Sequence, residues 1–107
     1  MASLLEQQCQ HQQTSLATTA QADHLQQLHE DWSVIADTQQ LIRTFKFKNY
    51  YETMAFVNLV AWISHQQDHH PDMEVGYNRC IVHYRTHSVD GLSLNDFICA
   101  AHIDKQQ

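Results

Sequence analysis

The stretch LIRTFKFKNYYETMAFVNLVAWISHQQDHHP, residues 41–71, decides the fold, because a strand pattern passes there directly into a helix pattern. The strand pattern comes first. Leu41, Phe45 and Phe47 share one face, and polar side chains occupy the other. A strand of this kind covers a hydrophobic core with its apolar face. The pattern therefore predicts a half-buried strand over residues 41–47.

A long helix is expected to follow this strand. Asn49 is a residue type that caps helix N-termini, and Glu52 stands where the reciprocal partner of a capping box belongs. The helix should run to about Gln67, because Pro71 disfavours the α conformation in the residue before it. Residues 54–63 are apolar nearly all round the helix, whereas a surface helix of a monomer shows one apolar stripe. The helix therefore needs two partners, a sheet and either a second helix or another subunit, which predicts an oligomer.

The remaining segments supply hairpins and two more helices. Residues 80–86 alternate between apolar and polar side chains and are expected to form a strand. Ser93 and Asp96 have the spacing of a capping box, so a last helix should begin there. The other expected elements are a short helix over residues 21–30 and short strands over 32–35 and 74–78. Strands grouped in hairpins with helices between them indicate an α+β fold, with one four-stranded antiparallel sheet and the helices on one face.

Composition limits the class of protein. The 107 residues are enough for one domain, which we place at residues 21–107 after a flexible, Gln-rich tail over 1–20. The net charge of −6 argues against a nucleic-acid or anionic-membrane partner. No apolar run reaches the roughly 20 residues of a membrane span, and no secretory signal is visible. Three cysteines without a CxxC pair indicate a reducing, cytoplasmic setting, with Cys80 and Cys99 as core residues.

The densest polar cluster, HQQDHHPD at residues 65–72, indicates proton chemistry. There Pro71 fixes the backbone directly after His69 and His70, and His87 follows the strand at 80–86. Imidazole is the side chain whose unperturbed pKa lies near neutrality, so it can donate or accept a proton. The chain has no Gly-rich phosphate loop and no GxSxG nucleophile elbow.

Competing interpretations of these residues stay open. His65 and His69 have the i, i+4 spacing of a zinc site on one helical face, but the cluster lacks the Glu of an HExxH motif. Asp96 is a candidate for orienting an imidazole, and it also has the position of a helix cap. Four further histidines are expected to be surface residues: His11, His24, His29 and His102.

A resemblance to a known family rests on several motifs in one order. DHHP stands at residues 68–71, THSVDGLS follows at 86–93, and Asp96 comes three positions after the GLS serine. Trp32 and the FKFK segment match earlier positions of the same pattern. Over about residues 22–104 the chain therefore resembles the pterin-4a-carbinolamine dehydratases. It departs from them in its longer tail, in its early C-terminal end, and at His65, where relatives often carry an acidic residue.

The resemblance implies a function and a fold. The fold is a four-stranded antiparallel sheet with helices on one side, assembled into homodimers or homotetramers. The reaction is removal of water from 4a-hydroxytetrahydrobiopterin, which gives quinonoid dihydropterin during tetrahydrobiopterin recycling linked to phenylalanine hydroxylation. No metal or other cofactor is needed. The alternative within the family is a protein that acts as a dimerisation partner of a transcription factor without catalysis.

The resemblance also implies roles for the site residues. His69, His70 and His87 should surround the reacting carbon and N5 of the pterin, with His70 and His87 as acid and base and His69 as an orienting group. Asp96 and Asp68 should orient an imidazole or the substrate. Pro71 should hold the backbone of the motif.

Overall fold

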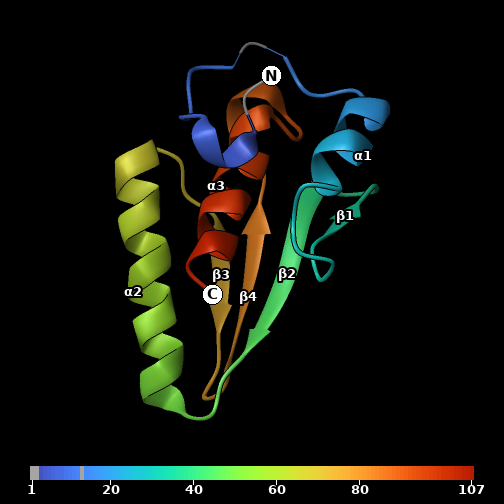
Figure 1. Ribbon diagram of the computed structural model, residues 1–107. Coiled ribbons are helices and arrows are strands. Elements are labelled where there is room, and N and C mark those ends of the chain that lie inside the picture. Colours follow the sequence, from blue (N-terminus) through green and yellow to red (C-terminus); the bar gives the residue numbers. More distant parts are fainter. Residues whose placement is uncertain (1–2, 13) are drawn as a thin grey trace.

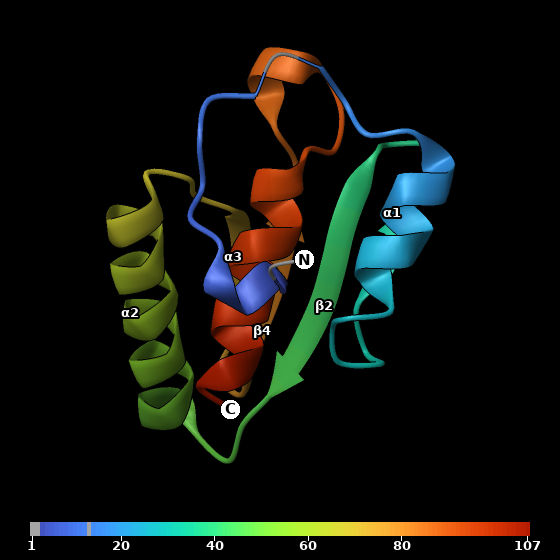
Figure 2. The ribbon, with the colours of Figure 1, turned by 45° about the horizontal axis from the view of Figure 1, so that its top comes forward.

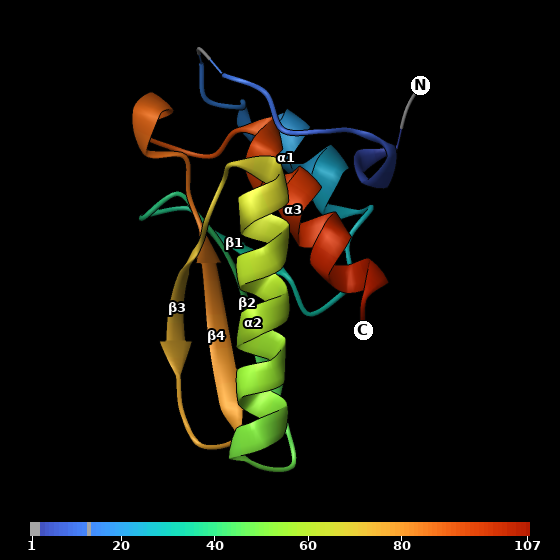
Figure 3. The same cartoon turned by 90° about the vertical axis from the view of Figure 1, so that its left-hand side faces the viewer.

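The computed structural model describes residues 3–12 and 14–107, and a four-stranded sheet forms one layer of it, behind the helices in Figure 1. The strands are β1 (Ser33–Ile35), β2 (Gln40–Lys46), β3 (Asp72–Val75) and β4 (Arg79–Tyr84). They are antiparallel and lie in the order β1-β2-β4-β3. The helices are α1 (Thr18–Leu25), α2 (Tyr50–Gln67) and α3 (Leu94–Lys105). Figure 3 shows all three helices on one side of the sheet, so the predicted α+β layout is confirmed.

The hydrophobic core lies between the sheet and these helices. From the sheet, Leu41 and Phe45 of β2 and alternate residues of β4 point into it, as the strand patterns predicted. Helix α2 contributes a single stripe, which includes Phe56 and Val60. Helix α3 is buried on more than one face, because residues 95–100 are all buried. Cys80 and Cys99 are fully buried in this core, as predicted.

Element boundaries differ from the predictions where turns compete with strands. The strand predicted at 74–78 begins at Asp72 and ends at Val75, because residues 76–78 turn and the Gly76 amide donates a hydrogen bond to the Arg79 carbonyl. The strand predicted at 80–86 ends at Tyr84, since Thr86 pairs only with Gly91 in an isolated bridge. The helix predicted at 21–30 runs from Thr18 to Leu25 instead.

Helix α2 begins as predicted and ends in a left-handed residue. The Asn49 side chain accepts a hydrogen bond from the Glu52 amide at 2.9 Å. The Glu52 carboxylate accepts from the Lys48 amide at 3.0 Å, one residue before the expected position of a reciprocal cap. At the other end Asp68 has a φ of 50°, which stops the helix after Gln67.

The described part of the N-terminal segment packs against the domain, in contrast to the flexible tail predicted for residues 1–20. Leu4 is only 1% exposed, and the Cys9 amide donates a hydrogen bond to Oε1 of Gln67 at 2.8 Å. In Figure 2 this blue segment passes over α3 before it reaches α1. The physical reason is that the sheet covers only one side of α3. The N-terminal segment covers part of the remaining side, so α3 is buried on several faces. Met1, Ala2 and Gln13 lie outside the described residues.

In residues 3–12 and 14–107, no helix has both the length and the apolar character that a membrane crossing requires.

Candidate active site

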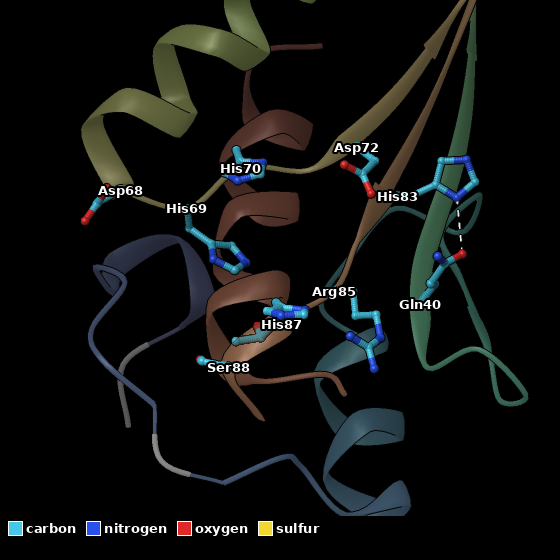
Figure 4. Close-up of a pocket in the computed structure, with 10 residues that line it drawn as sticks. Gln40, Asp68, His69, His70, Asp72, His83, Arg85, His87 and Ser88 are labelled. Carbon is cyan, nitrogen blue, oxygen red and sulfur yellow. Dashed lines mark hydrogen bonds between the residues drawn. The ribbon is translucent and has the colours of Figure 1, made fainter. Parts of the chain in front are cut away.

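A cavity of about 420 Å³ lies where α2 ends, β3 begins and β4 ends (Figure 4). Every residue that lines it has a polar side chain. It is lined by Gln40, Asp68, His69, His70, Asp72, His83, Arg85, Thr86, His87 and Ser88. Four of the residues singled out in the sequence are therefore brought together: Asp68, His69, His70 and His87.

Two chain turns bring the histidines to this cavity. The left-handed conformation of Asp68 turns the chain off the axis of α2, so His69 and His70 leave the helix. Buried Pro71 then leads directly into β3. His87 begins a single 3-10 turn just after β4. The two segments meet because β3 and β4 pair antiparallel, which places the start of one strand beside the end of the other.

His69 is held from behind by a buried carboxylate. Its Nε2 lies 2.7 Å from Oδ1 of Asp96, and Asp96 is 0% exposed. The His69 ring also stacks on Tyr84, with 5.8 Å between ring centroids and 10° between planes. Two directional contacts of this kind fix the orientation of the imidazole, and the carboxylate suits the tautomer in which Nε2 carries the hydrogen.

Asp96 is itself fixed by hydrogen bonds to its second oxygen. Oδ2 accepts from the Thr86 hydroxyl at 2.8 Å and from the Ser93 amide at 3.0 Å. The contact with Ser93 is the capping box that the sequence predicted for α3. Asp96 therefore caps the helix and orients His69 at once. It lies behind His69 and is not part of the cavity wall.

His70 and His87 have much freer rings than His69. Both residues are exposed, and Figure 4 shows both rings at the cavity. His70 Nδ1 lies 3.3 Å from the carbonyl oxygen of Pro71. Within residues 3–12 and 14–107, no hydrogen-bond partner is seen for the His87 ring. The geometry thus provides one oriented imidazole and two that can exchange protons with a ligand in the cavity.

Comparisons with known proteins identify the family of the chain. The sequence model described as "Pterin 4 alpha carbinolamine dehydratase" matches residues 14–106. The chain belongs to this family. A Nitrosomonas eutropha protein named "Putative pterin-4-alpha-carbinolamine dehydratase" is 65% identical over 80 residues, which are 75% of this chain and 69% of that protein. A Chromobacterium violaceum protein of the same name is 52% identical over 100 residues, 92% and 90% of the two chains.

Solved structures show the same fold. A Brucella melitensis protein described as a transcriptional coactivator/pterin dehydratase superimposes with a TM-score of 0.80 at 27% identity, over 86% of this chain and 97% of that one. A pterin dehydratase-like protein described as a RuBisCO assembly factor of the alpha-carboxysome gives a TM-score of 0.61 at 22% identity, over 72% and 89%. The second likeness extends to the fold alone.

The sequence interpretation missed the side of this dehydratase-family cavity that the sheet supplies. His83 Nε2 lies 2.5 Å from Oε2 of Glu74, and its Nδ1 lies 3.3 Å from Oε1 of Gln40 (Figure 4). Arg85, next along the same face, forms an ion pair with Asp90. Alternation along residues 80–86 did place His83 and Arg85 on one face. Only the strand order brings residues of β2 and β3 beside them.

A second cavity, of about 270 Å³, adjoins the first. Part of its wall comes from residues 9–12 of the N-terminal segment, which lie outside the region that the family model matches. Gln67 and Asn95 line it from α2 and α3, and His69 lines both cavities. The N-terminal segment therefore reaches the surroundings of the site, which no motif in the sequence indicated.

The zinc interpretation does not fit this geometry. His65 lies on α2, but His69 follows the end of that helix, so the two do not share a helical face. His69 Nε2 is also already engaged with Asp96. In the part of the chain that the structure describes, no group of three or more His, Cys, Asp or Glu residues is arranged to hold a metal ion.

Two of the four histidines predicted at the surface are half-buried. His24 packs on Phe97, with ring centroids 5.6 Å apart, and its Nδ1 is buried. His102 lies under the N-terminal segment, and its Nε2 is 3.3 Å from the Gln7 carbonyl. His11 and His29 are exposed, as predicted. Both corrections have the same reason, because α1 and the N-terminal segment pack on α3.

Proposed function

We propose that this protein removes water from 4a-hydroxytetrahydrobiopterin, or a close pterin analogue, to give the quinonoid dihydropterin. The observation that carries the proposal is that His69, His70 and His87 meet at one cavity, with His69 oriented by buried Asp96 and with His70 and His87 exposed. Membership of the family supports the choice of substrate.

The reaction needs two proton movements. A general acid protonates the 4a-hydroxyl so that it leaves as water, and a general base takes the proton from N5. An imidazole with a pKa near neutrality can perform either step, and each transfer is typically worth about 10²–10⁴-fold in rate. Neither step requires a metal ion or a covalent intermediate.

We assign the acid and base roles to His70 and His87, because these two are the exposed histidines of the cavity wall. His69 orients the pterin or its hydroxyl group, and Asp96 positions His69. Asp68 lines the rim of the same cavity, where it can contact the substrate's polar edge. Pro71 acts through the backbone, since it is buried and leads from the two histidines into β3.

The test is the rate at which 4a-hydroxytetrahydropterin is lost, followed by ultraviolet absorbance. We expect His70→Ala and His87→Ala each to lower turnover at least tenfold. His29→Ala, which changes an exposed histidine away from the cavity, should leave turnover unchanged. Circular dichroism establishes that each variant is folded, and parallel assays with a chelator should give equal rates. Full activity in a folded His70→Ala/His87→Ala double variant would refute the assignment.

In the cell, this activity belongs to tetrahydrobiopterin recycling. The substrate is the product that an aromatic amino acid hydroxylase forms from its pterin cofactor, so we propose a functional link to phenylalanine hydroxylation and a cytoplasmic location. The net charge of −6 disfavours direct contact with nucleic acid.

We also propose that the protein is a homodimer or homotetramer and that α2 contributes to the interface. Tyr51, Ala55 and Trp62 lie on the exposed side of this helix, opposite its buried stripe. Tyr51 is 81% exposed and Trp62 is 58% exposed, which is unusual for large aromatic side chains unless a partner covers them. The Brucella melitensis protein is described as a transcriptional coactivator as well as a pterin dehydratase, and a role of that kind would also require a surface for a partner.

A further inference from the structure

Two cysteines that are far apart in the sequence meet beside the candidate site. The Sγ atoms of Cys9 and Cys99 lie 3.5 Å apart, although 90 positions separate the residues. Both are free thiols. Cys99 is fully buried on α3, whereas Cys9 is half-buried on the N-terminal segment. The pair thus consists of one partly exposed cysteine, Cys9, and one fully buried cysteine, Cys99.

Hydrogen bonds on both sides of Cys9 fix it over α3. Its own amide donates to the Gln67 side chain at 2.8 Å, and its sulfur lies 3.6 Å from the Asn95 carbonyl. The next residue, Gln10, exchanges two hydrogen bonds with the Asn95 side chain, at 3.1 and 2.7 Å. These hydrogen bonds therefore hold the Cys9 sulfur beside the Cys99 sulfur.

We propose that Cys9 and Cys99 form a reversible disulfide when the protein meets a hydroperoxide. The Cys9 thiolate attacks one peroxide oxygen, the O–O bond breaks, and Cys9 becomes a sulfenic acid while the peroxide leaves as water or an alcohol. Cys99 then attacks the Cys9 sulfur, and the hydroxyl group leaves as water with the Cys99 proton. Overall the two thiols lose two electrons and two protons, and the peroxide is reduced.

The geometry requires only a small movement. A disulfide bond is about 2.05 Å long, so the sulfurs must approach by about 1.5 Å. The N-terminal segment can supply this movement, because residues 7–12 belong to no helix or strand. The hydrogen bond to Cys9, together with burial, raises the pKa of the Cys99 thiol above its usual range. Cys99 is therefore a poor first nucleophile, and the more accessible Cys9 meets the oxidant, with the Cys99 sulfur 3.5 Å away for the second step.

The disulfide would fasten the N-terminal segment beside the candidate site. Cys9 lines the second cavity together with His69, and the Cys99 sulfur lies 3.9 Å from the His69 carbonyl oxygen. A covalent bond across 90 positions also restricts the unfolded chain strongly. The proposal concerns the thiols themselves and does not depend on the dehydratase function.

Trypsin separates the three cysteines, which makes the test direct. Cleavage after Lys and Arg leaves Cys9 in residues 1–43, Cys80 in 80–85 and Cys99 in 86–105. The reduced protein is treated with hydrogen peroxide, unfolded, alkylated, digested and analysed by mass spectrometry. We expect a peptide of residues 1–43 joined to 86–105 that lacks two hydrogens, while Cys80 is recovered alkylated. Dithiothreitol should restore both separate peptides.

Cys9→Ser is the matched variant, because Cys9 is half-buried and its substitution leaves the core intact. In this variant the Cys99 peptide should stay fully alkylated after peroxide. The oxidised wild type should also unfold roughly 5 °C or more above its reduced form. The proposal is overturned if Cys9 bonds to another chain or to Cys80, if it is oxidised alone while Cys99 stays free, or if no thiol is lost.

Discussion

At the scale of single residues, Asp96 connects His69, which follows α2, to the segment between β4 and α3. One of its oxygens faces His69, and the other accepts hydrogen bonds from Thr86 and Ser93. The capping-box spacing made Asp96 visible in the sequence, yet that spacing could not tell a helix cap from a partner of an imidazole. The structure shows both contacts, because a carboxylate has enough lone pairs to make them together.

Asp96→Asn tests Asp96 as a positioning residue. The amide keeps the size of the side chain but replaces one acceptor oxygen with a donor, so either His69 or the Thr86 and Ser93 donors lose their partner. We expect turnover to fall at least tenfold with a changed pH–rate profile, and the unfolding free energy to fall by about 1–3 kcal/mol. Steady-state kinetics across pH and urea unfolding measure the two effects.

Asp23→Asn makes the same chemical change at an exposed position of α1 and should alter neither quantity. If Asp96→Asn lowers stability but keeps the wild-type pH profile and turnover, Asp96 is a helix cap only.

At the scale of elements, α2 shows how one helix serves two surfaces. The sequence was apolar around much of the helix, and this predicted two partners. The structure assigns the stripe with Phe56, Val60 and Ile63 to the core and leaves the side with Tyr51 and Trp62 exposed. Period and composition could reveal the excess of apolar residues, but not which of them face the sheet.

Trp62→Glu tests the exposed side of α2. A charge at the centre of an apolar interface is costly to desolvate, so we expect the variant to sediment as a single chain of 12.5 kDa while the wild type sediments as a dimer or tetramer. Gln26→Glu, at an exposed position after α1, is the control and should keep the wild-type mass. A wild type that already sediments as one chain, or a Trp62→Glu protein of unchanged mass, would contradict the proposed interface.

At the scale of the whole molecule, the layered packing keeps water away from Tyr84. This residue lies between the sheet and the helices and is 0% exposed. Burial, with smaller contributions from Cys99 and Asp96, raises the pKa of the Tyr84 hydroxyl well above its usual range. The folded state therefore keeps the proton at pH values where the unfolded chain loses it, and stability must fall as the pH rises above about 10.

Tyr84→Phe isolates this effect. Between pH 10 and 11, we expect the unfolding free energy of the wild type to fall by up to about 1.4 kcal/mol more than that of the variant. Urea unfolding at pH 8, 10 and 11 measures the difference. Tyr51→Phe changes an exposed tyrosine and should follow the wild type. Equal pH dependence in the wild type and Tyr84→Phe would mean that water reaches the Tyr84 hydroxyl in the folded protein.

The sequence by itself determined the features that depend on neighbours along the chain. Alternation placed Leu41 and Phe45 on the buried face of β2, and the Asn49 and Ser93 caps located the starts of α2 and α3. The DHHP motif singled out Asp68, His69 and His70, which line the first cavity. These features are local because strand period, helix caps and the effect of proline each act over a few residues.

Only the tertiary structure decided the features that join distant parts of the chain. The strand order put Glu74 and Gln40 beside His83, and the burial of α3 drew the N-terminal segment over it and brought Cys9 to Cys99. A Gln-rich segment with little apolar period gives no local signal of such packing. Its position depends on hydrogen bonds to Gln67 of α2 and Asn95 of α3. These partners come together only when the two helices have packed.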